Sequence, residues 1–267
     1  MSTGKVEPLM ANFSTIGILG GMGPEATNQL CALITALTPV SKDQDHIPVI
    51  SYNNPRIPDR VRAIEGSGES PVPEMIRTAQ VLEQAGASVL LMPCNLAHFY
   101  LDDVQQAIQI PLLNMVEETV RFTVENYPHC WKVGIIASTP TIECDIYGKF
   151  FRRYDRLLLA PDEDEQTTRV MKAIYGPSGI KCGYKTGPGA LLKEAAQHLI
   201  TRGAEIILAG CTEASLVMKQ QPSPFVVIDP MEVIARIAVE RAISEESRNA
   251  PEKNVRLNRG QVIPQAR

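Results

Sequence analysis

Eight short apolar runs, separated by longer helix-like stretches, constrain the fold of this chain more than any other feature of its sequence. Each run is continuously apolar rather than alternating, as strands covered by helices on both faces require. The runs lie at 15–20, 48–54, 88–94, 110–115, 132–138, 156–161, 205–211 and 225–230. They predict an α/β protein built on parallel sheets.

The eight runs form two matching sets of four, which indicates an internal duplication. TIGILGGMGP resembles KVGIIASTPT, AGASVLLMPCN resembles RGAEIILAGCT, and IPLLNMVEE resembles FVVIDPMEV. The spacing agrees as well, because Gly17 precedes Cys94 by 77 positions and Gly134 precedes Cys211 by the same 77. We therefore expect two pseudo-symmetric units, each with a four-stranded parallel sheet flanked by helices.

The expected domain bounds follow from this duplication. Residues 1–120 form the first α/β domain and residues 121–225 the second. A C-terminal helix at about 226–243 is expected to pack back on the first domain. The remaining segment, 244–267, is polar with little apolar periodicity, which predicts an exposed or partly disordered tail.

Composition excludes several classes of function. The net charge of -4 gives no basic surplus for nucleic acid, and no run of about 18 apolar residues is present to cross a membrane. The first 15 residues lack the apolar core of a secretory signal, so we expect a cytoplasmic protein. Its six cysteines form no CxxC pair and its four histidines form no ligand pattern, which argues against a metal site and favours reduced thiols.

Two cysteines occupy equivalent positions at the carboxyl ends of predicted strands, where open parallel sheets bind their ligands. Cys94 and Cys211 each precede a helix-like segment, with Asn95 and Thr212 available as caps. A helix start lowers the pKa of a thiol, so either cysteine is expected to ionise near neutrality. A thiolate and a thiol that face each other can remove a proton from one side of a stereocentre and return one to the other. Such a pair inverts configuration without a cofactor.

Two competing interpretations of the same region are weaker. GMGPEA at 21–26 matches a dinucleotide fingerprint, but the next strand ends in Asn53-Asn54-Pro55 without the acidic residue that holds a ribose. The glycines are therefore expected to permit a tight turn under the substrate. His98, one helical turn after Cys94, fits a half-buried structural histidine or one that tunes the cysteine better than a nucleophilic partner.

The sequence resembles the cofactor-independent aspartate/glutamate racemase family, and within it the aspartate racemases. The resemblance is carried by GILGGMGPEAT, NNPRIPDR, MPCNLAH, EDEQ, GIKCG and AGCTEAS, in this order. It implies two α/β domains with the active site in the cleft between them, an isomerase that needs no pyridoxal phosphate or other cofactor, and a homodimer. A more distant likeness is to racemases that supply D-aspartyl units to nonribosomal peptides such as microcystin.

The resemblance also implies roles for individual residues. Cys94 and Cys211 match the two catalytic acid/base residues, while Arg60 and Lys181 match the side chains that hold the two carboxylates of aspartate. Lys185 is a rival of Lys181 for this role, and Arg56 is either a second carboxylate contact or a surface residue. The expected substrate contacts are Met22, Gly23, Asn54, Asp59, Arg60, Asn95, Leu96, Ala97, Lys181, Thr212 and Glu213.

One departure from the family pattern leaves the substrate open. Family members usually carry CNT where this chain has Cys94-Asn95-Leu96, so an apolar group replaces a hydroxyl that commonly contacts substrate. The resemblance implies a racemase that interconverts L- and D-aspartate. The alternatives are a glutamate or broad-specificity racemase, a decarboxylase or isomerase on the same scaffold, and a non-enzymatic dicarboxylate-binding protein.

Overall fold

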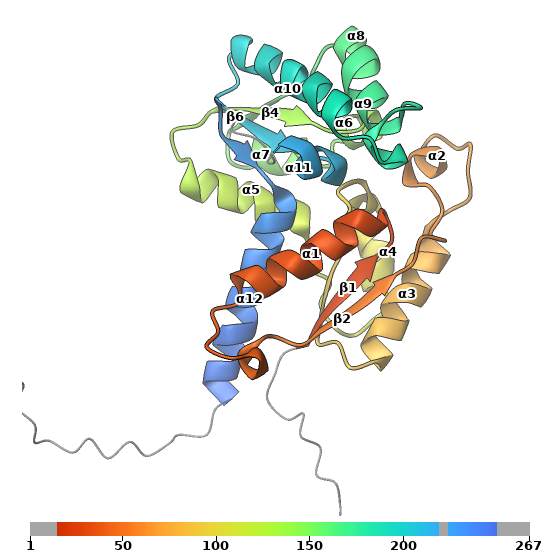
Figure 1. Cartoon of the computed structure of the whole chain (residues 1–267), viewed down its shortest axis with the longest axis vertical. Helices are drawn as coiled ribbons and strands as arrows, with labels where there is room; N and C mark the ends of the chain where they lie inside the picture. Colours follow the sequence, from red (N-terminus) through yellow and green to blue (C-terminus); the bar gives the residue numbers. More distant parts are fainter. Residues whose placement is uncertain (1–14, 219–223, 250–267) are drawn as a thin grey trace, which may run out of the picture.

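The computed structural model describes residues 15–218 and 224–249, and side chains as far as Ser244. It contains two parallel sheets, each at the centre of one α/β unit (Figure 1). The first sheet has the order β2-β1-β3, from β1 (Ile16–Gly20), β2 (Val49–Asn53) and β3 (Val89–Leu91). The second has the order β5-β4-β6-β7, from β4 (Lys132–Ile136), β5 (Leu157–Leu159), β6 (Ile206–Ala209) and β7 (Val227–Ile228). The α/β fold with two parallel sheets is confirmed.

The fourth predicted strand of the first unit is much shorter than expected. The segment 110–115 contributes a single parallel bridge between Leu112 and Leu90, at the place that β7 takes in the second sheet. Two residues explain the difference. Pro111 has no backbone N–H to donate, and Asn114 already caps the next helix by accepting from the amide of Glu117.

Within the described residues, five long helices cover the sheets, and shorter helices connect them. The long helices are α1 (Pro24–Leu37), α3 (Val72–Gln84), α5 (Met115–Asn126), α10 (Thr186–Thr201) and α12 (Pro230–Asn249). The short ones are η1 (Asp43–Asp45), α2 (Arg60–Ile64), η2 (Leu96–Tyr100), α4 (Leu101–Gln105), α6 (Thr139–Glu143), α7 (Gly148–Arg152), α8 (Glu163–Glu165), η3 (Gln166–Met171, a π-helix), α9 (Lys172–Tyr175), η4 (Ile180–Cys182) and α11 (Thr212–Met218). None of the helices in the described part is long and apolar enough to cross a membrane.

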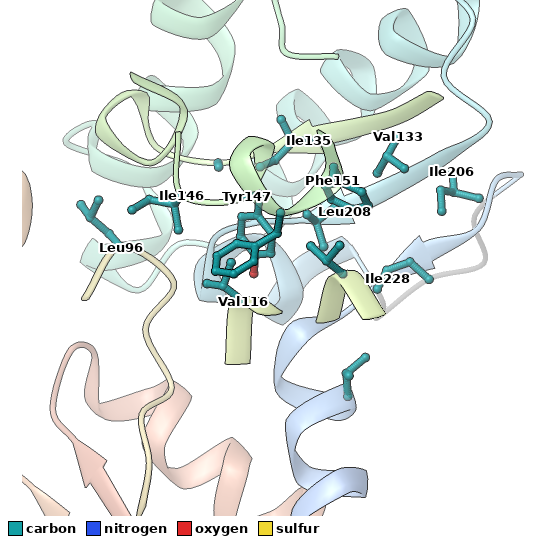
Figure 2. Close-up of a cluster of buried hydrophobic side chains, with 14 of the residues drawn as sticks. Leu96, Val116, Val133, Ile135, Ile146, Tyr147, Phe151, Ile206, Leu208 and Ile228 are labelled. Carbon is teal, nitrogen blue, oxygen red and sulfur yellow. The ribbon is translucent and has the colours of Figure 1, made fainter. Parts of the chain in front are cut away.

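The two units share their hydrophobic cores. The C-terminal helix α12 lies against α1 (Figure 1), where Met231 and Ile234 join a cluster with Leu30 and Ile34. In the other direction, α5 contributes Val116 to the cluster that surrounds the second sheet, and Leu96 joins the same cluster (Figure 2). These contacts hold the two units together around the region where both catalytic candidates lie.

The helix α12 is longer than the sequence predicted. It continues through Asn249, so the first residues of the expected tail are helical. The rest of that segment, 250–267, lies outside the described residues.

Candidate active site

A small cavity between the two units brings Cys94 and Cys211 to the same place. Cys94 follows β3 and Cys211 follows β6, so both thiols lie beyond the carboxyl ends of equivalent strands. The cavity encloses about 20 Å³, which is room for roughly one water molecule. Its walls are formed by Met22, Arg60, Cys94, Asn95, Leu96, Ser138, Thr141, Tyr175, Lys181, Gly210, Cys211, Thr212 and Glu213.

An open groove of about 530 Å³ adjoins this cavity. The two spaces share Arg60, Lys181 and Glu213, so the groove leads directly to the thiols. Because the cavity itself holds only about one water, an amino acid needs these shared walls to move apart before it reaches both cysteines.

Burial and the Glu213 carboxylate both favour the protonated form of Cys211. The Cys211 thiol donates to Oε2 of Glu213 at 2.8 Å, while Lys181 Nζ lies 2.5 Å from Oε1 of the same carboxylate. Burial, and then the negative charge of Glu213, raise the pKa of Cys211 well above its ordinary value. The expectation that a helix start would lower this pKa is therefore wrong for Cys211.

Lys181, whose side chain is 25% exposed, forms an ion pair with the buried Glu213. Burial opposes the charged form of each, but the partner's charge and the hydrogen bonds around the pair together outweigh it, so the pKa of Lys181 is raised and that of Glu213 is lowered. Both side chains are thus charged at neutral pH. Thr212, expected as a helix cap, instead donates its hydroxyl hydrogen bond to Glu213 Oε2 at 3.1 Å.

Cys94 is fixed through its backbone by His98. His98 Nδ1 lies 2.8 Å from the carbonyl oxygen of Cys94, and His98 Nε2 accepts from the amide of Met115 at 3.1 Å. Nδ1 therefore carries the proton, and both ring nitrogens are occupied. Burial lowers the pKa of His98 from 6.5 to about 4, so the ring is neutral. It positions the Cys94 turn and has no free nitrogen for the thiol.

Arg60 is a buried cation without a carboxylate partner in the described part of the chain. Its guanidinium donates to the carbonyl oxygens of Ile57, Pro58 and Met22, and Nε is buried without a partner. Asp59 starts α2 by accepting from the amide of Arg62, which places Arg60 in the first turn of that helix. A buried guanidinium of this kind favours binding of a carboxylate.

Asn95 contacts the second unit instead of capping a helix. Its Oδ1 accepts a hydrogen bond from the hydroxyl of Tyr147, and its Nδ2 is buried without a partner. The helix-cap role expected for Asn95 is therefore wrong, because its backbone is helical and its side chain makes no capping hydrogen bond. Leu96 faces both the cavity and the apolar cluster in Figure 2.

Comparisons with known proteins identify the family of this chain. Residues 19–238 match the family described as Asp/Glu/Hydantoin racemase. The chain belongs to this family. The broad specificity amino-acid racemase RacX of Bacillus subtilis (strain 168) is 29% identical over 238 residues, which cover 87% of this chain and 100% of RacX.

Solved structures of racemases share the fold. The aspartate racemase of Picrophilus torridus superposes with a TM-score of 0.73 at 28% identity, over 86% of this chain and 94% of that chain. A glutamate racemase isoform, RacE1 of Bacillus anthracis, superposes with a TM-score of 0.60 at 17% identity, over 87% and 81% of the two chains. The likeness to the second structure concerns the fold alone.

Four of the residues that the sequence predicted as substrate contacts do not line the cavity. Gly23 and Asp59 line the adjoining groove. Asn54 links the end of β2 to α3, since its Nδ2 donates to Glu74 at 2.8 Å and to Thr78 at 2.9 Å. Ala97 is fully buried in the core of the first unit.

The structure also shows where the glycine-rich turn and the two candidate lysines lie. Gly21 has φ +102, and a Cβ there would lie 2.1 Å from the carbonyl oxygen of Asn54, so only glycine fits this turn. Lys181 lines the cavity, whereas Lys185 forms an ion pair with Glu25 at the groove. Arg56 lines the groove and not the cavity.

Sequence reasoning missed three side chains of the cavity. Ser138 and Thr141 hydrogen-bond each other at 2.8 Å, and Lys181 Nζ lies 5.2 Å from the centroid of the Tyr175 ring. The internal repeat contained a signal for the first of these, because Ser138 is the counterpart of Gly21 in the glycine turn. Tyr175 has no comparable signal, since α9 has no matching segment in the paired motifs.

The three carboxylates of the EDEQ segment do not line the cavity. Glu163, Asp164 and Glu165 line a separate open groove with His198, which pairs with Glu165. No cluster of three potential metal ligands occurs among residues 15–218 and 224–249.

Proposed function

We propose that this chain is a cofactor-independent racemase that interconverts L- and D-aspartate by moving the α-proton between Cys94 and Cys211. The observation that carries the proposal is the single cavity that both thiols line, each from a different unit. A substrate bound between them presents one face of its α-carbon to each cysteine. No other described pair of acid/base side chains in this cavity comes from equivalent positions of the two units.

The charges of the site suit the two steps of this reaction. Cys211 holds its proton against Glu213, so Cys94 is assigned as the base and Cys211 as the acid in one direction. Cys94 thiolate takes the α-proton, the electron pair remains on the α-carbon and its carboxylate, and Cys211 delivers its proton to the opposite face. The cysteines finish with their protonation exchanged, which is the state required for the reverse direction.

The carboxylates of aspartate have two candidate anchors. Arg60 is buried with carbonyl partners only, so a substrate carboxylate supplies the anion that the guanidinium lacks. Lys181 is the second anchor, and it must share its charge between Glu213 and the substrate. The Nδ2 group of Asn95, buried without a partner, is available to stabilise charge that develops on the α-carboxylate.

A broad-specificity amino-acid racemase is the second candidate, favoured by two features of the site. The Lys181–Glu213 pair neutralises the distal anchor, and Leu96 adds an apolar surface beside it. Both features lower the preference for a second carboxylate. The 29% sequence identity to RacX, a broad-specificity racemase, supports the same alternative.

One experiment tests the racemase function. Proton NMR follows L-aspartate with purified protein in heavy water without added cofactor, while circular dichroism follows the same sample. We expect loss of the α-proton signal together with decay of the optical signal to zero. An unchanged spectrum with aspartate, but racemisation of lysine or alanine, favours the broad-specificity alternative; no exchange with any amino acid refutes both.

A further inference from the structure

We infer that Tyr147 is a positioning residue of this site, which holds the Asn95 side chain so that its NH₂ group faces the substrate. The inference rests on the proposed function and deepens it. It concerns a residue outside the cavity wall that none of the motifs above contains.

Tyr147 is held rigidly by its surroundings. It lies immediately before α7 in the second unit, is 1% exposed, and packs at the centre of the cluster with Phe151 and Leu208 (Figure 2). Close packing of this kind leaves the phenol ring a single position. The hydroxyl is therefore a fixed point in the second unit.

The hydroxyl acts on Asn95 in the first unit. It donates to Asn95 Oδ1, so the amide oxygen is turned toward Tyr147. Burial, reinforced by the negative charge of Asp229, raises the pKa of Tyr147 well above its ordinary value, so the phenol keeps its proton and remains a donor.

The other end of the same amide is unused. Asn95 lines the cavity beside Cys94, and its Nδ2 is buried without a partner. A buried NH₂ without an acceptor is unfavourable, and a substrate carboxylate in the cavity supplies that acceptor. If the amide turned by 180°, its oxygen would face the carboxylate and repel it, and the hydrogen bond from Tyr147 would be lost.

The test compares Tyr147→Phe with Asn95→Ala and with the double variant. Tyr147→Phe keeps the ring and removes the donor, so we expect kcat/KM to fall by about ten-fold or more, as for the loss of an oriented active-site donor. In the Asn95→Ala background the same change should alter kcat/KM by less than about two-fold, because Tyr147 acts through Asn95. Equal losses in both backgrounds would overturn the inference and leave Tyr147 a packing residue.

Tyr127→Phe is the matched control variant. Tyr127 is a partly buried tyrosine packed on the same cluster but outside the cavity. Removing its hydroxyl should leave kcat/KM unchanged. A loss equal to that of Tyr147→Phe would show that the cluster as a whole, rather than the Asn95 contact, controls activity, and would refute the inference.

A binding measurement separates this inference from the proposed function. Protein labelled with ¹⁵N at asparagine is titrated with racemic aspartate, which is at equilibrium from the start, and the Asn95 side-chain signals are assigned with Asn95→Ala. We expect these signals to shift in the wild type and to shift several-fold less at equal ligand in Tyr147→Phe. This result in a protein without racemase activity would refute the function and keep the role of Tyr147. Absence of any shift at Asn95 in the wild type would overturn that role.

Discussion

Replacing Glu213 by glutamine should release Cys211 from its protonated state. The substitution keeps the size of the side chain and removes the negative charge that accepts from the thiol at 2.8 Å. Because that charge raises the pKa of Cys211, its loss lowers the pKa. The substitution also leaves Lys181 without its counter-ion, and the free positive charge favours the Cys211 thiolate further.

The size of this change follows from the contact. A hydrogen bond to a charged group contributes about 1.5–3 kcal/mol, and about 1.4 kcal/mol corresponds to one pKa unit, so we expect a decrease of about one to two units. The Coulomb repulsion between a thiolate and a carboxylate 2.8 Å apart, about 6 kcal/mol at an effective dielectric constant of about 20, sets an upper limit near four units.

The assay is alkylation of Cys211 by iodoacetamide over a pH series, read for each cysteine by mass spectrometry. The pH midpoint is compared, rather than the rate, because access to the cavity affects only the rate. Cys182 is exposed and outside the cavity, so it serves as a reference within each sample. The double variant Lys181→Gln/Glu213→Gln shows how much of the decrease comes from the freed lysine. A Cys211 midpoint in Glu213→Gln that is unchanged, or higher than in the wild type, would refute this account of the thiol.

Two further predictions concern the lysines and the buried histidine. Lys181→Gln should raise KM for aspartate at least about ten-fold, whereas Lys185→Gln should change it less than about two-fold, because of these two lysines only Lys181 lines the cavity. Steady-state kinetics on variants with matched melting temperatures checks this prediction. Equal effects of the two substitutions on KM would contradict it. His98 has a pKa of about 4 in the fold against 6.5 ordinarily, so the unfolded chain binds the extra proton between these values and stability falls as the pH drops from about 6.5 towards 4. Between pH 7 and pH 5, His98 should lower the free energy of unfolding by about 2 kcal/mol. Urea unfolding of His98→Gln should not show this decrease. An identical pH dependence of stability in both proteins would show that His98 is not its source.

The fold was largely predictable from the sequence, because its strands are continuous apolar runs and its two halves repeat. The spacing of Gly17, Cys94, Gly134 and Cys211 placed the cysteines at equivalent strand ends, and both line one cavity. The exception was the segment 110–115, where Pro111 and the helix cap at Asn114 leave a single bridge. In that segment the proline and the helix cap prevent an apolar run from forming a full strand.

The protonation and orientation of the site were not predictable in the same way. A helix start suggested a lowered pKa at Cys211, but burial of the thiol, and then the neighbouring Glu213 carboxylate that accepts from it, raise that pKa. Asn95 was expected to cap a helix, yet its partner is Tyr147, 52 positions away and in the other unit. The Asn95–Tyr147 contact depends on how the two units pack, and no local pattern records it.

The most direct test of the central claim is the position of the isotope after brief turnover in heavy water. Protiated L-aspartate is incubated until a small fraction has reacted, and the two enantiomers are separated and weighed by mass spectrometry. If Cys94 and Cys211 act on opposite faces, the D-aspartate formed carries deuterium at the α-carbon while the remaining L-aspartate keeps its proton. D-aspartate that retains the original proton, or L-aspartate that exchanges before any D-aspartate forms, would show that a single base serves both faces and would contradict the account.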